Sequence, residues 1–158
     1  RHALVTGGEP LLQKNTPLLV RALGHAGYAV SVETHGEAPI GEITGIARII
    51  MDIKTPGSGV GAEHWKDNLP KLGPSDEIKF VLTSRQDYEW AREIVKSGIL
   101  PAETTVLFSA SIPNGSNSTD GAGIPPVTLA EWILEDHLPV RIQLQLHKIL
   151  WGTDKKGI

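Results

Sequence analysis

Polar and small residues gather at five places in the sequence, each directly after a strand-like apolar run. These places are residues 6–10 (TGGEP), 33–37 (ETHGE), 52–57 (DIKTPG), 109–111 (SAS) and 145–148 (QLHK). Parallel α/β folds place their sites at the carboxyl ends of their strands, so these segments should meet at one edge of a sheet. A Gly-Gly turn lets a ligand approach the backbone closely, and its free N–H and C=O groups can bind that ligand. Together the five segments predict a site for a polar small molecule.

Several other kinds of site have no support in the sequence. The phosphate-binding patterns GxGxxG and GxxxxGK[ST] are missing, and so is the GxSxG pattern of a serine nucleophile. The six His residues show neither the HxxxH nor the HExxH spacing of a zinc site. Cysteine is absent, so this chain alone cannot form a disulfide, a thiolate nucleophile or a cysteine-held iron–sulfur cluster. We therefore assign no metal ligand to this chain.

The elements that must position these segments are strands that alternate with helices. Runs rich in β-branched and apolar residues predict six strands, at 3–6, 29–34, 48–53, 77–82, 105–109 and 140–146. Capping signals predict helices that begin near Thr16, Ser84 and Thr128, and the third should run to about residue 138. This alternation predicts an α/β fold with a mainly parallel sheet, open or partly closed as a barrel. No boundary is visible, so we expect a single domain over residues 1–158.

Each predicted strand has two faces of different character, because side chains alternate across a strand. In the last strand an apolar face with Ile142, Leu144 and Leu146 alternates with a polar face that carries Arg141, Gln143, Gln145 and His147. The polar faces of the other strands carry Ser31, Glu33, Asp52, Lys54, Glu77, Lys79, Ser109 and Ser111. Helices need apolar surface to pack on, so they should cover the apolar faces. The polar faces should then line an interior that holds a polar ligand.

Charge and hydropathy narrow the range of partners. The chain has 15 Lys+Arg against 18 Asp+Glu, a net charge of −3 and a pI near 6.1, so we expect no nucleic-acid partner. No apolar run approaches the roughly 18 residues of a membrane span, and the N-terminus lacks a signal-peptide pattern. We expect no membrane partner and a cytoplasmic location.

Five motifs in this order resemble the 7-carboxy-7-deazaguanine synthases of the radical S-adenosylmethionine (SAM) superfamily: TGGEPLL, VETHGE, MDIKTPGSG, DEIKFVL and QLQLHKILWG. GGEP is shared across the superfamily, whereas DIKTPGSG and QLHK are more specific. The resemblance implies a partial TIM-like barrel that uses SAM, a [4Fe–4S] cluster and Mg²⁺. It also implies a lyase that converts 6-carboxy-5,6,7,8-tetrahydropterin to 7-carboxy-7-deazaguanine for queuosine-type nucleosides. The implied partners are an electron donor such as flavodoxin and a second copy in a homodimer.

The same resemblance implies roles for individual residues. Thr6 and His147 would contact the pterin substrate. The methionine end of SAM would be received by the turn that contains Gly7, Gly8, Glu9 and Pro10. SAM or its ribose would be faced by Glu33, Asp52, Ile53, Lys54 and Ser109. An alternative for the charged residues among them is mutual ion pairing, because charges buried together must pair. Glu77 and Lys79 fit a structural role better than a catalytic one.

The sequence departs from the family pattern in one respect. The family holds its cluster with a CxxxCxxC loop, which would lie upstream of Arg1, and this chain has no Cys. We therefore expect the chain alone to be inactive and to be the C-terminal portion of a longer enzyme. Two alternatives are a fragment of a glycyl-radical-enzyme activase, which shares only GGEP, and a non-catalytic SAM-binding α/β module.

Overall fold

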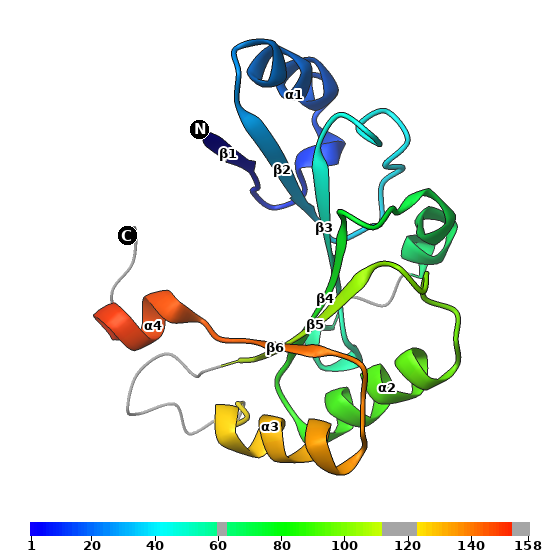
Figure 1. The fold of residues 1–158 in the computed structure, drawn as a ribbon, viewed down its shortest axis with the longest axis vertical. Helices are drawn as coiled ribbons and strands as arrows, with labels where there is room; N and C mark the ends of the chain where they lie inside the picture. The colour runs from blue at the N-terminus through cyan, green and yellow to red at the C-terminus, as the bar shows by residue number, and fades with distance from the viewer. Residues whose placement is uncertain (60–62, 112–122, 153–158) are drawn as a thin grey trace.

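The fold is an open sheet of six parallel strands with helices on its outer side (Figure 1). The computed structural model describes residues 1–59, 63–111 and 123–152 of the 158. The strands are β1 (His2–Val5), β2 (Ala29–Thr34), β3 (Arg48–Ile53), β4 (Glu77–Leu82), β5 (Thr105–Ala110) and β6 (Arg141–Gln143). They lie in the sheet in chain order, and β1 and β6 are its two unjoined edges. The expected partial, open barrel is confirmed.

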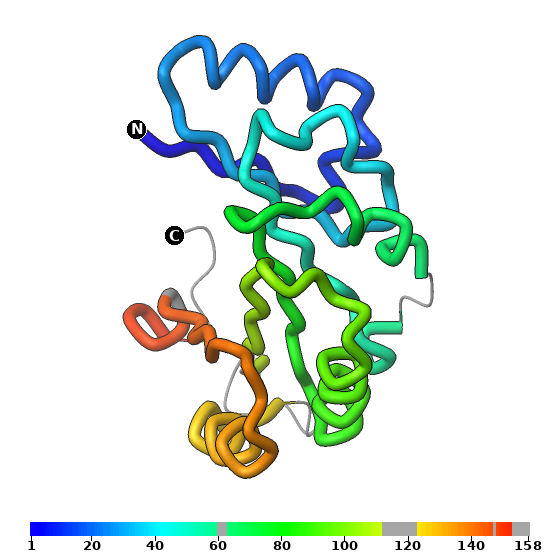
Figure 2. Tube along the Cα trace, turned by 45° about the vertical axis from the view of Figure 1, so that its right-hand side comes forward, coloured from blue at the N-terminus to red at the C-terminus, as the bar shows by residue number. Residues whose placement is uncertain are grey.

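Most of the helices follow a strand and lie on the outer side of the sheet, whereas the last one, near the C-terminus, lies at the open side of the molecule (Figure 1). The α-helices are α1 (Thr16–His25), α2 (Arg85–Lys96), α3 (Pro126–Glu135) and α4 (Leu146–Trp151). Three 3-10 helices add to them: η1 (Pro10–Leu12), η2 (Pro56–Ser58) and η3 (His64–Lys71). Turned by 45°, the trace shows α2 and α3 at the opposite end of the molecule from α1 (Figure 2). Among the residues that the structure describes, no helix is long and apolar enough to cross a membrane.

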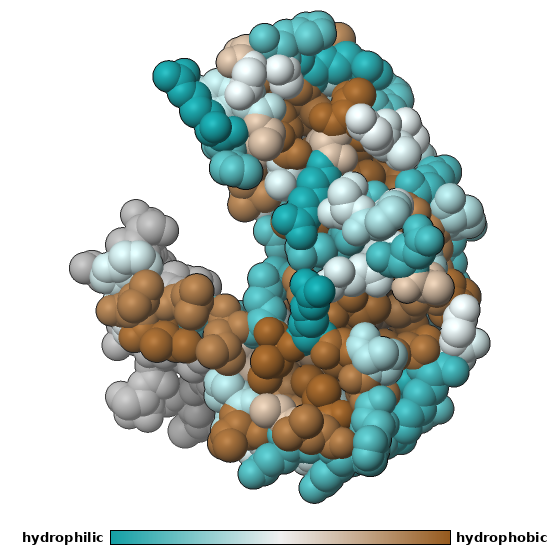
Figure 3. Space-filling model, viewed as in Figure 1, coloured by the Kyte–Doolittle hydropathy of each residue, from teal (hydrophilic) through white to brown (hydrophobic). Residues whose placement is uncertain are grey.

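The two faces of the sheet differ as the alternation predicts. The outward side chains pack under the helices and are fully buried; they include Val32, Ile49, Met51, Ile53, Ile78 and Phe80. The inward face carries three ion pairs, formed by Lys79 with Glu33 at 2.7 Å, Lys54 with Asp52 at 2.7 Å and Arg48 with Glu77 at 2.6 Å. The space-filling view shows a C-shaped molecule, hollow between the N-terminal strand and α4 (Figure 3).

The last predicted strand is wrong at its end. β6 pairs with β5 only from Arg141 to Gln143, and the chain then turns into α4 at Leu146. Past Gln143 the backbone has no ladder partner among the described residues, and it closes a helix instead, with bonds from Lys148 N and Ile149 N to Gln145 O. His147 therefore lies in a helix and does not extend the polar face of a strand.

One predicted helix start also differs. α3 begins at Pro126 rather than at Thr128, and no side chain caps it. Proline suits the first helical position because its φ is already helical and it has no N–H to satisfy, so the helix starts two residues earlier. The prediction at Ser84 is confirmed, since its hydroxyl accepts a hydrogen bond from the Asp87 N–H at 3.2 Å.

Candidate functional site

A polar cavity lies at the carboxyl ends of β1, β2 and β3, at the edge where the sequence predicts a site. It has a volume of about 140 Å³ and is lined by Thr6, Gly7, Gly8, Glu33, Thr34, His35, Asp52 and Lys54. Six of these eight are among the predicted ligand contacts, and they come from three segments of the chain. The parallel register explains the meeting, because Val5 pairs with Val32 and Thr34 pairs with Met51. β2 therefore runs two residues beyond the end of β1, and β3 runs two residues beyond the end of β2, so the three ends form one staggered edge.

The two glycines of the first turn line the cavity, and the space where their side chains would lie is open. A Cβ placed on either Gly7 or Gly8 would have no protein atom within 4 Å. A side chain at these positions would take up space that is now free, and it would hold a ligand away from the backbone. The turn therefore offers N–H and C=O groups at short range, which suits a group that carries both an ammonium and a carboxylate.

The charged side chains of the cavity are paired, but one acceptor is left over. Lys54 Nζ donates to Oδ2 of Asp52 at 2.7 Å, and Asp52 is only 8% exposed. The other oxygen, Oδ1, is buried and has no hydrogen-bond partner within the described part of the chain. A buried acceptor without a partner costs about 1–3 kcal/mol, so a donor from a ligand would stabilise this arrangement. Ion pairing alone thus leaves one oxygen of Asp52 unexplained.

The Glu9 side chain does not point into the cavity, although the resemblance assigns it to the turn that receives the methionine end of SAM. Its carboxylate is buried and accepts hydrogen bonds from the Thr34 hydroxyl, the His35 N–H at 2.8 Å and the Leu11 N–H at 2.9 Å. The ring nitrogen Nε2 of His35 also lies 3.2 Å from it. Glu9 therefore fastens the turn after β1 to the end of β2, and it does not line the cavity.

Four other predicted residues also lie away from the cavity wall. Pro10 is buried at the start of η1, and the side chain of Ile53 belongs to the apolar core on the outer face. Ser109 is buried in β5, opposite Gln143 of β6. His147 lies in α4, and its side chain is outside the part that the structure describes.

Thr34 and His35 line the cavity although the alternation of faces does not select them. Thr34 follows Glu33 and so lies on the opposite face of β2, where it reaches Glu9. His35 comes after the strand has ended, where the two-residue period no longer applies. The signal that includes both is the ETHGE motif itself.

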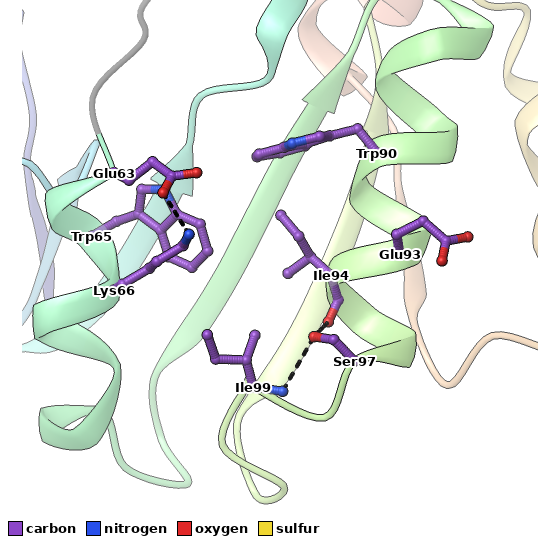
Figure 4. A pocket seen from close by; sticks show the side chains of 8 residues that line it. All are labelled: Glu63, Trp65, Lys66, Trp90, Glu93, Ile94, Ser97 and Ile99. Atoms are coloured by element: carbon purple, nitrogen blue, oxygen red, sulfur yellow. Dashed lines mark hydrogen bonds and ion pairs between the residues drawn. The ribbon is translucent and has the colours of Figure 1, made fainter.

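A second cavity lies between η3 and α2, on the helix side of the sheet (Figure 4). It measures about 280 Å³, and its apolar walls are the side chains of Trp65, Trp90, Ile94 and Ile99. Charged groups at its margin are already paired, as Lys66 with Glu63 at 2.6 Å. It is larger than the strand-end cavity but contains none of the residues predicted to bind ligand, so we do not assign the function to it.

The residues present suit SAM but do not suit the cluster. Gly7 and Gly8 leave room for its amino acid end, and Oδ1 of Asp52 can accept a hydrogen bond from a hydroxyl or an ammonium. A [4Fe–4S] cluster is held by Cys thiolates, and the sequence has no Cys. Within residues 1–59, 63–111 and 123–152, no group of three or more acidic or His side chains could hold a metal ion.

Three relatives share most of this chain's length. The 7-carboxy-7-deazaguanine synthase of Koribacter versatilis (strain Ellin345) is 41% identical over 160 residues, which cover 98% of this chain and 70% of that protein. That of Chlorobaculum tepidum is 36% identical over 98% of this chain and 67% of its own length. That of Methanospirillum hungatei is 36% identical over 94% and 58%. This chain thus spans about two thirds of the length of these relatives.

Solved structures agree on the architecture, and no protein-family model matches the sequence. QueE from Escherichia coli has a TM-score of 0.64 at 21% identity, over 92% of this chain and 57% of that one. A domain of the pyruvate-formate lyase-activating enzyme from Bacteroides vulgatus has a TM-score of 0.65 at 14% identity, over 90% and 97%. At these identities the likeness is one of fold alone, so it does not distinguish a deazaguanine synthase from a glycyl-radical-enzyme activase. The identity of 41% over nearly the whole chain and 70% of the relative shows that this chain belongs to the 7-carboxy-7-deazaguanine synthase family.

Proposed function

We propose that this chain is the SAM- and substrate-binding part of a radical SAM lyase that converts 6-carboxy-5,6,7,8-tetrahydropterin to 7-carboxy-7-deazaguanine. The observation that carries the proposal is the strand-end cavity. Its Gly7–Gly8 turn, Glu33, Asp52 and Lys54 come from three neighbouring strands and line one space. The family relationship supports the same reaction, since relatives at 36–41% identity are named for it.

The cavity matches one end of SAM rather than the whole molecule. Its volume of about 140 Å³ is below the range of roughly 300–1,000 Å³ that is typical for sites of drug-sized ligands. In the proposal, the turn at Gly7 and Gly8 binds the ammonium and carboxylate of the methionine group. A ribose hydroxyl donates to Oδ1 of Asp52, which gives that buried oxygen the partner that it lacks. The rest of the ligand then extends into the hollow of the C-shaped molecule.

The pterin would bind beside SAM, in contact with Thr6 and His147. Thr6 lines the cavity directly after β1, and its hydroxyl can both donate and accept a hydrogen bond. The proposal keeps His147 as a substrate contact, reached from α4 rather than from a strand. Ser109, buried in β5, and Ile53, with its side chain in the core, would act on the ligand only through the shape of the site.

The cluster must be held outside this chain, because the sequence contains no Cys. When bound, a [4Fe–4S] cluster supplies the electron that cleaves SAM. We propose that the cluster, Mg²⁺ and the docking site of an electron donor such as flavodoxin belong to residues beyond this chain, and that the chain alone does not perform the reaction. The proposal also includes a homodimer in the cytoplasm.

Calorimetric titration with SAM tests the site independently of turnover. The chain should bind SAM, and Asp52→Ala should weaken binding by more than about tenfold, because it removes a charged hydrogen-bond acceptor. Asp67→Ala is the matched control, since Asp67 is exposed on η3 and away from the cavity. Failure of the unmodified chain to bind SAM, or equal affinities of Asp52→Ala and Asp67→Ala, would contradict the proposal.

A further inference from the structure

The Asp87 carboxylate ties together two segments that are distant in the sequence. Asp87 lies in the first turn of α2 and is only 1% exposed. Its Oδ1 accepts a hydrogen bond from the Gly57 N–H at 2.9 Å, and its Oδ2 accepts from the N–H of Thr83 at 3.1 Å and from the Thr83 hydroxyl at 2.5 Å. Both oxygens are therefore used, one for each segment.

The segment held by Oδ1 is the turn formed by residues 55–59, which we call the 55–59 turn. It follows Lys54 directly and is closed by bonds from the N–H and the hydroxyl of Ser58 to Thr55 O, at 2.9 and 2.6 Å. The bond from Gly57 N–H joins this turn to α2, and the side chain of Thr55 also acts on the Asp87 carboxylate and helps to lower its pKa. A turn that is closed on itself moves as a unit, so fixing Gly57 fixes the chain beside Lys54.

Position 57 has to be glycine for this contact to form. A Cβ there would lie 2.7 Å from Oδ2 and 2.9 Å from Oδ1 of Asp87, and 3.0 Å from the Thr83 hydroxyl. Real Cβ atoms do not approach oxygen so closely, so any side chain at this position would push the carboxylate away. The glycine and the carboxylate are thus matched to each other.

Capping of α2 does not require the Asp87 side chain in this way. Ser84 caps the helix, since its hydroxyl accepts from the Asp87 N–H. In a capping box the acidic residue at the third helical position would return a hydrogen bond to the N–H of the cap residue. Here both carboxylate oxygens are engaged with Gly57 and Thr83 instead. Burial raises the pKa of Asp87, but the hydrogen bonds from Thr83 and Gly57 outweigh it and hold the pKa below its ordinary value.

We propose that Asp87 is a positioning residue for the SAM site: it anchors the 55–59 turn and thereby holds Lys54 in the strand-end cavity. Lys54 is long, and its side chain is 35% exposed, so its place depends on the backbone on both sides of it. β3 fixes the backbone up to Ile53, and the 55–59 turn fixes it from Thr55 onward. Holding a charged group in place before the ligand arrives lowers the cost of binding. The identity of the ligand rests on the proposed function.

Asp87→Asn tests the anchor with almost no change in shape. An amide has one oxygen and no charge, so the Gly57 N–H either faces the NH₂ group and loses its acceptor or keeps a neutral oxygen that binds it more weakly than the carboxylate does. We expect the Gly57 amide to exchange with solvent about 10- to 100-fold faster, as measured by NMR. The dissociation constant of SAM, measured by calorimetry, should rise about tenfold, and the side-chain signals of Lys54 should shift.

Asp136→Asn is the matched control. It makes the same chemical change in another carboxylate that binds α2, through Tyr88, Arg92 and Lys96, and it is not bonded to the 55–59 turn. This variant should leave the exchange of Gly57 within about threefold of the unmodified chain, and the affinity for SAM within about twofold. A purely structural role for Asp87 predicts that the two variants behave alike.

The possible outcomes distinguish a failure of the proposal about Asp87 from a failure of the proposed SAM-binding function. Unchanged Gly57 exchange in Asp87→Asn, or faster exchange with unchanged affinity for SAM, would overturn the proposal about Asp87. If the unmodified chain does not bind SAM, the proposed function fails, and the Lys54 signals then decide whether Asp87 positions this side chain. If Asp87→Asn does not fold, Gly57→Ala displaces the same carboxylate and should give the same tenfold loss of affinity.

Discussion

The Thr34 hydroxyl lies 2.9 and 2.8 Å from the two oxygens of the Glu9 carboxylate, so the turn after β1 is bonded to the end of β2. The same carboxylate accepts the backbone N–H of His35 at 2.8 Å. Because Glu9 is buried, each of these bonds replaces contacts that water would otherwise make. The contact holds the Gly7–Gly8 turn beside Glu33, and this juxtaposition forms two walls of the cavity.

Glu9→Gln should therefore destabilise the fold. The amide keeps the shape but turns one oxygen into a donor that faces N–H groups, and hydrogen bonds to a charged group are worth about 1.5–3 kcal/mol. We expect a loss of that order in the free energy of unfolding, measured by urea denaturation. Glu131→Gln, at an exposed position on α3, should change it by less than about 0.5 kcal/mol. Equal midpoints for the two variants would show that the buried contact contributes nothing.

The charged residues that line the cavity lead to a second prediction, which concerns the affinity for SAM rather than the stability of the fold. Lys54→Ala removes the cation that pairs with Asp52, and Glu33→Ala removes the partner of Lys79. Each should weaken SAM binding by at least about tenfold, because a charged contact to the ligand or to a neighbour of the ligand is lost. Lys66→Ala, on η3, removes an equal charge away from the cavity and should leave affinity unchanged. If calorimetry finds one affinity for all three folded variants, these charges serve only as ion pairs.

The pH dependence of stability should show the contribution of Asp136. Hydrogen bonds from Tyr88, Lys96 and Arg92 lower the pKa of Asp136 from 3.8 to about 2, against the opposing effect of burial. A carboxyl whose pKa is lower in the folded state stabilises the fold at pH values above the unfolded pKa of 3.8. This contribution is lost as the pH falls from 3.8 through about 2.

Urea midpoints between pH 2 and pH 5 would measure this loss. Asp136→Asn should be less stable than the unmodified chain at pH 5, and the difference should shrink toward pH 2. Other carboxylates titrate in both proteins, so the difference between the two curves isolates Asp136. A difference that stays constant over this range would rule out the titration of Asp136 as its cause.

Local patterns predict the parts of this fold that local forces determine. β2, β3 and β4 begin and end where the apolar and β-branched runs predict, because alternation and burial act residue by residue. The end of β6 is not local in this sense. The segment 144–146 has strand-like alternation, but a strand also needs a ladder partner, and the pairing with β5 stops at Gln143. Without that partner, the residues from Leu146 onward form α4.

The same distinction separates the residues whose place in the site follows from sequence patterns from two carboxylates whose partners do not. Thr6, Gly7, Gly8, Glu33, Asp52 and Lys54 share the cavity because strand ends in a parallel sheet lie at one edge. Glu9 and Asp87 instead bind backbone groups that are 26 and 30 residues away. Nothing in the neighbourhood of either residue specifies that partner. The motif shows that a carboxylate is present, but the direction of its side chain follows from tertiary packing.

His147 is the residue through which the substrate proposal is tested apart from the SAM proposal. An imidazole can donate one hydrogen bond and accept another, which suits the amide and carboxylate edges of a pterin. Losing one hydrogen bond to a charged partner costs about 1.5–3 kcal/mol, so His147→Ala should weaken pterin binding by about one to two orders of magnitude. The measurement is a pair of calorimetric titrations, first with SAM alone and then with 6-carboxytetrahydropterin added to the SAM complex.

Affinity for SAM should stay within about twofold, because the strand-end cavity is lined by residues of β1, β2 and β3 and of the turns that follow them. His137→Ala is the control, since His137 is exposed beyond the end of α3 and bonds to Glu135 O. Unchanged pterin affinity in His147→Ala would remove this residue from the site, while a matched loss of both affinities would show that it supports the fold of α4 instead.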